Sequence, residues 1–200
     1  MNDLDKIDEI LDIYYSEQIT PCFDMTPDRV NFEEAQALMS KGFFCAEQLV
    51  FLELEPHFAA YKNEEIEIEK VTEHHVDEFL ELISLSTGKE SKKVLAEKKV
   101  KYYYQPDFQN YIAYIGEKAI GMGSLFIKGE EGYIANDFTF PSYRGKGVQK
   151  ALLQRRIQDS KEMGLNKLYT DVEFGSISHD NMLKLGFNTI FINSFWTKAE

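Results

Sequence analysis

A ten-residue stretch, "PSYRGKGVQK" at residues 141–150, constrains the fold more than any other feature of the chain. The apolar run "YIANDFTF" precedes it, and the helix-forming run "ALLQRRIQDSKEMG" follows it. Glycine lets the backbone adopt unusual φ and ψ angles and lets a ligand approach closely. The free N–H groups at the start of a helix attract anions. The stretch therefore predicts a strand-to-helix turn that binds phosphate groups. The alternative is a glycine-containing surface turn without a ligand.

Two common phosphate-binding patterns do not fit this turn. A P-loop needs a glycine, four residues and then Gly-Lys-Ser/Thr. Here Gly145-Lys146 is followed by Gly147, and no glycine stands where the loop should begin. A dinucleotide fingerprint needs Gly-x-Gly-x-x-Gly, but Lys150 occupies the third glycine position.

A third pattern fits better. The run "RGKGVQ" at residues 144–149 resembles the acyl-CoA signature Gln/Arg-x-x-Gly-x-Gly/Ala of the GCN5-related N-acetyltransferase (GNAT) family. Arg144 and Gly147 match, whereas Gln149 departs from Gly/Ala. With "FTFPSY" before it and "LGF" downstream, the resemblance covers roughly residues 65–200. It implies an α/β fold with a GNAT-like mixed, mostly antiparallel central sheet flanked by helices in three layers.

Hydrophobic spacing predicts the order β-α-α-β-β-β-α-β-α-β after residue 65, with one helix over residues 88–101. Residues 1–60 read as helix, strand, helix, strand, and their "LMSKGF" matches the place of the later "MLKLGF". We therefore predict an acidic, partial GNAT-like repeat at 1–60 and an acyl-CoA-binding acyltransferase domain at 65–200. The alternative is that any helix-Gly-Phe-strand unit looks like this, because glycine favours helix C-termini.

The resemblance implies which residues bind coenzyme A. The diphosphate would lie on the main-chain amides of the turn, and the pantetheine arm would pair with the strand before it. Ser178 and Asn181 lie near the family's usual tyrosine position, and Asn181 could bond the cofactor. The expected cofactor-binding residues are Phe138, Thr139, Arg144, Gly145, Lys146, Gly147, Val148, Gln149, Lys150, Ser178 and Asn181.

Catalysis of acetyl transfer to an amine needs a group that removes a proton. Asp137 and Glu173 are the candidate general bases. Simple alternation would place Tyr133, Ala135, Asp137 and Thr139 on one face of their strand. Many family members carry a tyrosine that protonates the leaving thiolate, but here the position holds Met182, which cannot donate a proton. Tyr143, Ser178 or water could replace it, or protonation could be unnecessary.

Composition excludes several classes of partner. The net charge of −12 and a pI near 4.9 argue against nucleic acid. Residues 1–60 carry −10 of that charge (3 basic against 13 acidic residues), which is either a solvated acidic surface or a rim that steers a cationic amine. The sequence has no apolar run of the length that predicts a membrane span, and its acidic start does not fit a secretory signal. Only two cysteines are present, which fits a cytoplasmic protein. Adjacent His74 and His75 do not face one way on a helix, so no metal site is expected.

These features together predict an acyl-CoA-dependent N-acyltransferase with acetyl-CoA as co-substrate. The amine would attack the thioester directly in a ternary complex. The acceptor would be a small-molecule or peptide amine, for which a cationic compound is one alternative. Residues 102–104, "YYY", could line its pocket or simply pack. The alternative function is a catalytically weak acyl-CoA-binding or regulatory module, and residues 1–60 could form a homodimer contact.

Overall fold

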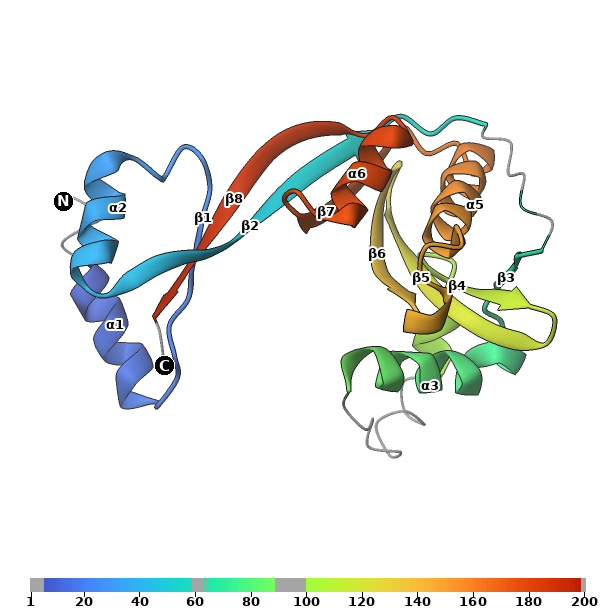
Figure 1. Cartoon of the computed structure of the whole chain (residues 1–200), viewed down its shortest axis with the longest axis horizontal. Coiled ribbons are helices and arrows are strands. Elements are labelled where there is room, and N and C mark those ends of the chain that lie inside the picture. Colours follow the sequence, from blue (N-terminus) through green and yellow to red (C-terminus); the bar gives the residue numbers. More distant parts are fainter. Residues whose placement is uncertain (1–5, 59–62, 64, 89–99, 199–200) are drawn as a thin grey trace. The chain divides into compact units, whose positions relative to one another are not determined.

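The computed structural model describes residues 6–58, 63, 65–88 and 100–198 (Figure 1). The chain divides into two compact units. Unit 1 contains Met1–Leu52 and Asp171–Glu200, and unit 2 contains Glu53–Thr170. Residues 171–200 thus group with the N-terminal segment, although they belong to the predicted domain 65–200.

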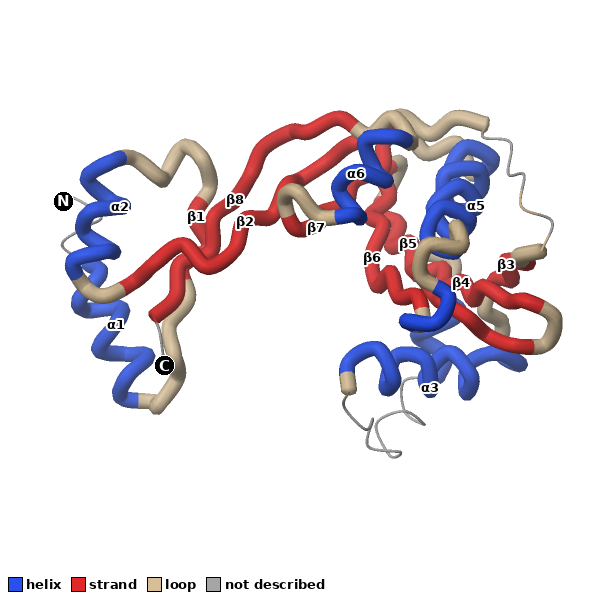
Figure 2. Tube along the Cα trace, viewed as in Figure 1, coloured by secondary structure: helices blue, strands red, loops and turns tan. Residues whose placement is uncertain are grey.

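Unit 2 is a mixed, mostly antiparallel sheet with helices on both faces (Figures 1 and 2). Its strand order is β7-β6-β5-β4-β3, and every neighbouring pair is antiparallel except the parallel pair β6–β7. This arrangement confirms the predicted fold class. The elements are β3 (Glu67–Lys70), η2 (Glu73–His75), α3 (Val76–Thr87), η3 (Val100–Tyr104), β4 (Phe108–Ile115), β5 (Lys118–Lys128), β6 (Glu131–Thr139), η4 (Pro141–Tyr143), α5 (Val148–Glu162) and the start of β7 (Lys167–Glu173).

Local sequence explains where most of these elements end. Gly116 has a φ of 58° in the turn between β4 and β5, so the predicted hairpin is confirmed. Gly88 ends α3 in the left-handed conformation that glycine favours. The predicted helix at 88–101 lies mostly outside the described residues, and at its far end the chain forms η3.

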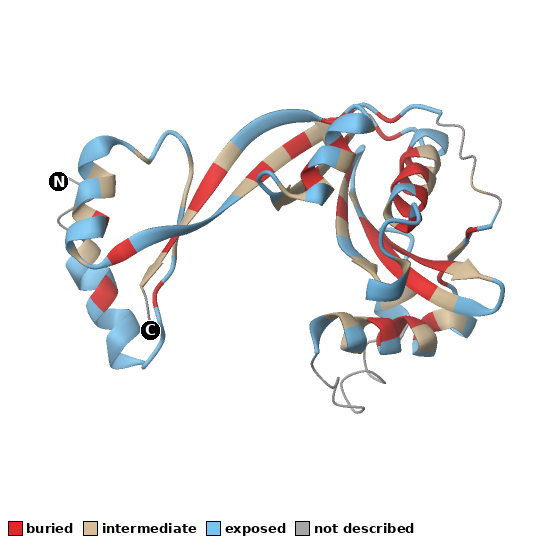
Figure 3. Ribbon diagram, in the orientation of Figure 1, coloured by how far each residue is buried: buried red, intermediate tan, exposed pale blue. Residues whose placement is uncertain are grey.

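Helices α3 and α5 cover opposite faces of β5 (Figure 1). On the α5 face, a Cβ atom added to Gly121 would lie 2.9 Å from Val148 Cγ1. On the α3 face, Met122 packs in the cluster that contains Phe79 and Leu80. Since side chains alternate along a strand, Gly123 and Leu125 also face α5, whereas Ser124 and Phe126 face α3. Figure 3 shows the buried stripe of α5.

A β-bulge interrupts β6 opposite Gly123. Met122 pairs with Phe138 and Ser124 pairs with Ala135, so Gly123 faces both Asn136 and Asp137. Asn136 has a φ of 55°, in the left-handed region that asparagine tolerates. The prediction that Ala135 and Asp137 share a face is therefore wrong, because the extra residue shifts the alternation. Tyr133 and Ala135 pair with Phe126 and Ser124 and so lie on the α3 face, whereas Thr139 pairs with Gly121 on the α5 face.

Unit 1 joins the N-terminal segment to the end of the chain. Strands β1 and β8 pair antiparallel, and the strand order is β1-β8-β2. A small core contains Leu11, Leu38, Phe43 and Trp196, while residues 44–48 and 188–191 are exposed (Figure 3). The predicted order helix, strand, helix, strand is confirmed, whereas the superposition of the two repeats stays a prediction. The elements are α1 (Ile7–Ser16), β1 (Phe23–Met25), α2 (Phe32–Ser40), β2 (Phe43–Leu54), α6 (Ile177–Lys184) and β8 (Asn188–Lys198).

Candidate acyl-CoA site and adjoining cavity

The glycine-rich turn between β6 and α5 has the predicted backbone form. Gly145 and Gly147 have φ values of 76° and 87°, which L side chains rarely adopt. Gly147 directly precedes α5, and its carbonyl accepts the Ala151 amide at 3.0 Å. Residues 144–147 are exposed. Glycine thus occupies the two positions of the turn that have positive φ. The first N–H groups of α5 follow directly, and such groups have no carbonyl partner within the helix.

Some of the expected amide donors are free and others are not. The Lys146 amide donates to the Tyr143 carbonyl at 3.4 Å, so the prediction that it is free for a ligand is wrong for this structure. The Arg144 amide likewise donates to the Pro141 carbonyl at 3.3 Å. Among the described residues, no hydrogen-bond acceptor lies on the amides of Gly145, Gly147, Val148 and Lys150. These four amides can bind an anion.

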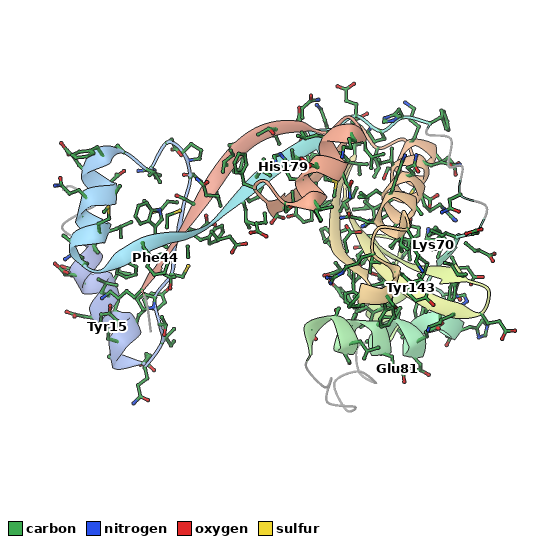
Figure 4. All side chains as sticks on the ribbon, viewed as in Figure 1. Tyr15, Phe44, Lys70, Glu81, Tyr143 and His179 are labelled. Atoms are coloured by element: carbon green, nitrogen blue, oxygen red, sulfur yellow. The ribbon has the colours of Figure 1, made fainter. Side chains whose placement is uncertain are left out.

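Cationic side chains lie beside this turn. The Lys146 and Lys118 ammonium groups lie 4.9 Å and 5.4 Å from the centroid of the Tyr143 ring, which Figure 4 labels. Two ammonium groups on one ring concentrate positive charge in a chain whose net charge is −12. Local charge and free amides therefore both favour a phosphate-bearing ligand.

Strand β6 leaves the sheet partly open next to the turn. On one side, Phe138 and Thr139 pair with Met122 and Gly121 of β5. On the other side, the register with β7 covers only Glu131 to Tyr133, and the Thr170 hydroxyl then donates to the Ile134 carbonyl at 3.1 Å. From residue 135 to 139 this edge of β6 has no strand partner in the described part of unit 2. An amide-bearing arm such as pantetheine can bond there.

Asp137 lies in the bulge and binds a buried arginine. The Nη2 of Arg156, whose side chain has 0% exposure, donates to Oδ1 of Asp137. Burial raises the pKa of Asp137, while the charge and the hydrogen bond of Arg156 lower it. Arg156 also donates to the carbonyls of Leu152 (3.0 Å), Ser124 (3.0 Å) and Ala135 (3.3 Å). Arg156 therefore fixes the bulge, a role that the sequence analysis missed.

A cavity of about 440 Å³ lies on the α3 side of the bulge. Its wall comes from the end of α3, from η3, and from the strands β4 to β6. It confirms that two residues of the tyrosine run line a pocket. The lining residues are Ile83, Ser86, Thr87, Tyr102, Tyr103, Phe108, Met122, Asn136, Asp137 and Phe138.

A chain of buried hydrogen bonds joins the bulge to the aromatic side of this cavity. Asn136 Nδ2 donates to Ser124 Oγ at 3.1 Å, and Ser124 donates to Asn110 Oδ1 at 2.5 Å. Asn110 Nδ2 in turn donates to the Tyr103 carbonyl at 2.7 Å and the Phe108 carbonyl at 3.2 Å. Asn110 and Ser124 are fully buried, so the bond between them lies outside water, while Asn136 is exposed; the bonds of Asn110 hold η3 against the sheet.

The remaining predicted site residues lie in unit 1. Glu173 ends β7, and Ser178 and Asn181 lie on α6, so their part in the site stays a prediction. Met182 is buried. His179, labelled in Figure 4, accepts the Gly175 amide on Nδ1 at 3.2 Å, and its buried Nε2 has no partner in the described part of the chain.

Within the described residues, no group of three or more His, Cys, Asp or Glu side chains could hold a metal ion. The Nε2 atom of His75 lies 3.2 Å from Oε2 of Glu69. In the same residues, no helix has the length and apolar character needed to span a membrane.

Comparison with known proteins gives the family. A model of the acetyltransferase (GNAT) family matches residues 68–187, which is more than half of the chain. The chain belongs to the GNAT family. The part matched includes the turn, the bulge and the cavity. No curated protein matches the chain.

Solved structures share the GNAT fold at low identity. A functionally unknown conserved protein from Staphylococcus epidermidis ATCC 12228 has a TM-score of 0.71 at 10% identity, over 98% of this chain and 80% of that one. A GCN5-related N-acetyltransferase from Kribbella flavida has a TM-score of 0.70 at 13% identity, over 97% of this chain and 74% of that one. A GCN5-related N-acetyltransferase from Sphaerobacter thermophilus has a TM-score of 0.73 at 13% identity, over 90% of this chain and 59% of that one. These likenesses show the fold, and family membership supports acyl-CoA-dependent acetyl transfer as the general class of reaction.

Proposed function

We propose that this GNAT protein is an N-acyltransferase that transfers acetyl from acetyl-CoA to an amine within a ternary complex. One observation carries the proposal: the turn before α5 has free amides at Gly145, Gly147, Val148 and Lys150, next to an open edge of β6. The amides suit a diphosphate, and the open edge suits the amide groups of pantetheine.

The residues present fit coenzyme A in both charge and backbone geometry. The turn would hold the diphosphate, with Arg144 and Lys146 adding side-chain charge. The main chain of Phe138 and Thr139 would orient the arm. Bound acetyl-CoA supplies an activated acetyl group. The protein has to bind it, admit an amine and accept the amine's proton.

Asp137 and Glu173 remain the proposed general bases, acting directly or through water. The raised pKa of Asp137 supports it, because a base works best when its pKa approaches the working pH. Its bond to Arg156 gives it a structural role as well. Thiol-release rates of Asp137→Asn and Glu173→Gln across neutral and alkaline pH separate the two: the variant of the base loses the parent's pH dependence, and a profile unchanged in both rejects both.

Calorimetry with acetyl-CoA tests the turn itself. Gly147→Ala adds a side chain at a φ of 87° where the ligand approaches, and we expect binding to weaken about 10-fold, equal to one lost charge-assisted hydrogen bond. Gly129→Ala is the matched control, since Gly129 has a φ of 62° in the β5–β6 turn with open space around it. Equal loss of affinity in both variants would reject the proposed site.

A second candidate, a weak acyl-CoA-binding or regulatory module, is favoured by Met182 at the family's usual tyrosine position. A thiol-release assay over a panel of amines separates it from the enzyme. Tight binding of acetyl-CoA without release for any amine would favour the module.

A further inference from the structure

The cavity beside the bulge carries almost no unbalanced charge. Of its lining residues that the structure describes, only Asp137 has a formal charge. The Asp137 carboxylate is bonded to Arg156, whose own side chain is fully buried, so the pair compensates itself. A second or third positive charge on a ligand would meet no further carboxylate in this wall. The wall therefore gives a polycation no advantage over an amine with one charge, which the partly exposed Asp137 carboxylate can face.

The polar groups of the wall are already partly committed. Ser86 Oγ donates to the Ile83 carbonyl at 2.9 Å, and Asn136 Nδ2 donates to Ser124 Oγ. A ligand rich in hydroxyl groups would have to bury many of them with few partners. Burying a hydroxyl group without a hydrogen-bond partner costs free energy, so the wall also disfavours sugar-like ligands.

The rest of the wall is mainly apolar, and its aromatic rings contact one another. The ring centroid of Tyr102 lies 4.7 Å from Phe108 and 5.4 Å from Tyr103. Tyr103 also lies 5.9 Å from Phe79 of the α3 core. Burial raises the pKa of Tyr103, with a further contribution from Tyr102, so its phenol stays neutral. The hydrogen bonds from Asn110 fix the backbone behind these rings. Rigid rings suit a flat apolar group.

The cavity volume limits the size of the occupant. About 440 Å³ lies near the lower end of the range for small-molecule sites, roughly 300–1,000 Å³. The main chain of Phe138 is the proposed partner of the pantetheine arm. Phe138 also lines the cavity. An amine that occupies the cavity would therefore lie next to the donor.

We infer that the acceptor is an arylalkylamine: a primary amine with one positive charge and an aromatic body held by Tyr102, Tyr103 and Phe108. This inference rests on the proposed function. In the reaction the ammonium first loses one proton to the general base or to solvent, a C–N bond then forms, the thioester C–S bond breaks, and the second proton passes from the nitrogen to the thiolate. No oxidant or reductant is required.

A panel of amines with thiol release as readout tests the class of acceptor. We expect kcat/KM for 2-phenylethylamine to exceed the values for ethylamine, spermidine and N-acetyl-lysine amide by about 10-fold or more, as apolar pockets discriminate. A value for spermidine or the lysine amide equal to or above that of 2-phenylethylamine overturns the inference.

A variant that fills the cavity tests the place of binding. Ser86→Phe puts a ring into the cavity wall and should lower kcat/KM for 2-phenylethylamine about 10-fold, with a clearly smaller loss for ethylamine, which has no aromatic body to exclude. Leu85→Phe is the matched control, because the neighbouring Leu85 is 60% exposed and does not line the cavity. Equal effects of Ser86→Phe on both amines, or equal effects of the two variants, overturn the inference.

Calorimetry separates failure of this inference from failure of the proposed function. 2-Phenylethylamine is titrated into the protein saturated with coenzyme A, so that no turnover is needed. Binding that Ser86→Phe weakens and Leu85→Phe does not supports the inference even where no amine is acetylated, a result that would reject only the enzyme. Absence of binding overturns the inference, whatever the thiol-release assay shows.

Discussion

On its α5 face, strand β5 has Gly121 and Gly123, whereas on its α3 face it has Met122, Ser124 and Phe126. The first face is filled: a Cβ atom on Gly121 would lie 2.7 Å from the Phe138 carbonyl oxygen, and one on Gly123 would lie 2.8 Å from Arg156 Cζ. The second face contains a cavity of about 440 Å³.

The filled face has one fully buried charge, Arg156, among apolar side chains of α5, whereas aromatic side chains and a polar network surround the hollow face. Arg156 replaces apolar side chains on the α5 face and bonds the main chain and Asp137. Aromatic side chains on the α3 face surround space. We therefore expect substitutions on the α5 face to change mainly stability, whereas the α3 face is where we propose that a ligand binds.

The largest expected effect comes from Arg156→Met. The change leaves the Asp137 carboxylate, whose side chain is 20% exposed, and the buried Ser124 carbonyl without their partner, so we expect the free energy of unfolding in urea to fall by about 3 kcal/mol. Arg155→Met is the control: Arg155 is 38% exposed, pairs with Asp159 and donates to the Ile68 carbonyl at 2.7 Å, and its removal should cost about 1 kcal/mol, clearly less than that of Arg156. Similar losses in both variants would mean that the buried pair does not hold the α5 face. Adding Asp137→Asn to Arg156→Met should recover part of the stability.

Gly123→Ala comes next, with an expected loss of about 1–3 kcal/mol from overpacking against Arg156. A double-mutant cycle sharpens the comparison. In the Arg156→Met background the cost of Gly123→Ala should shrink, because the clashing guanidinium is gone. The cost of Gly129→Ala, which arises from its φ of 62°, should be the same in both backgrounds. A Gly123→Ala cost that does not depend on residue 156 contradicts this account.

The smallest effect concerns alkaline pH and one tyrosine on each face. Tyr111 donates to Asp159 on α5 at 2.9 Å, and Tyr114 donates to Glu78 on α3 at 2.6 Å. Burial and the carboxylates raise the pKa of both phenols. A raised pKa in the folded state contributes stability that is present below the ordinary value of about 10 and is lost as pH rises above it.

We therefore expect the free energy of unfolding to fall as pH rises above about 10. Tyr111→Phe should flatten that fall more than Tyr114→Phe, because Tyr111 has 0% exposure. Urea unfolding at neutral and alkaline pH measures this fall in the free energy of unfolding. An identical pH dependence in the parent and in Tyr111→Phe would rule out this contribution.

Sequence patterns predict the elements of unit 2 well where short-range physics decides them. Gly116 predicts the hairpin turn, and Gly145 and Gly147 before a helix-forming run predict the turn and α5. The bulge could not be predicted in this way, because a two-residue alternation carries no sign of an extra residue at Asn136. The grouping of residues 171–200 with the N-terminal segment depends on long-range strand pairing, which local spacing does not encode.

The candidate site was predicted in part for the same reasons. The free amides follow from glycine and from the start of a helix, whereas the Lys146 amide depends on where the Tyr143 carbonyl points. Arg155 and Arg156 are alike as sequence, yet one is partly exposed and the other buried. The glycines at 121 and 123 were the available signal, since strand glycine marks a close approach. The residues around the cavity come from five separate elements, and only the fold brings them together.

In the part of unit 2 that the structure describes, the edge of β6 from residue 135 to 139 lacks a strand partner. Main-chain donors and acceptors there are a ready template for any extended polar chain, and a guest that pairs with them serves as a missing strand. Affinity at this position depends on backbone pattern more than on side-chain identity. If the proposed donor binds through this main chain, side-chain substitutions in the neighbouring cavity away from β6 should alter the choice of acceptor more than the affinity for the donor.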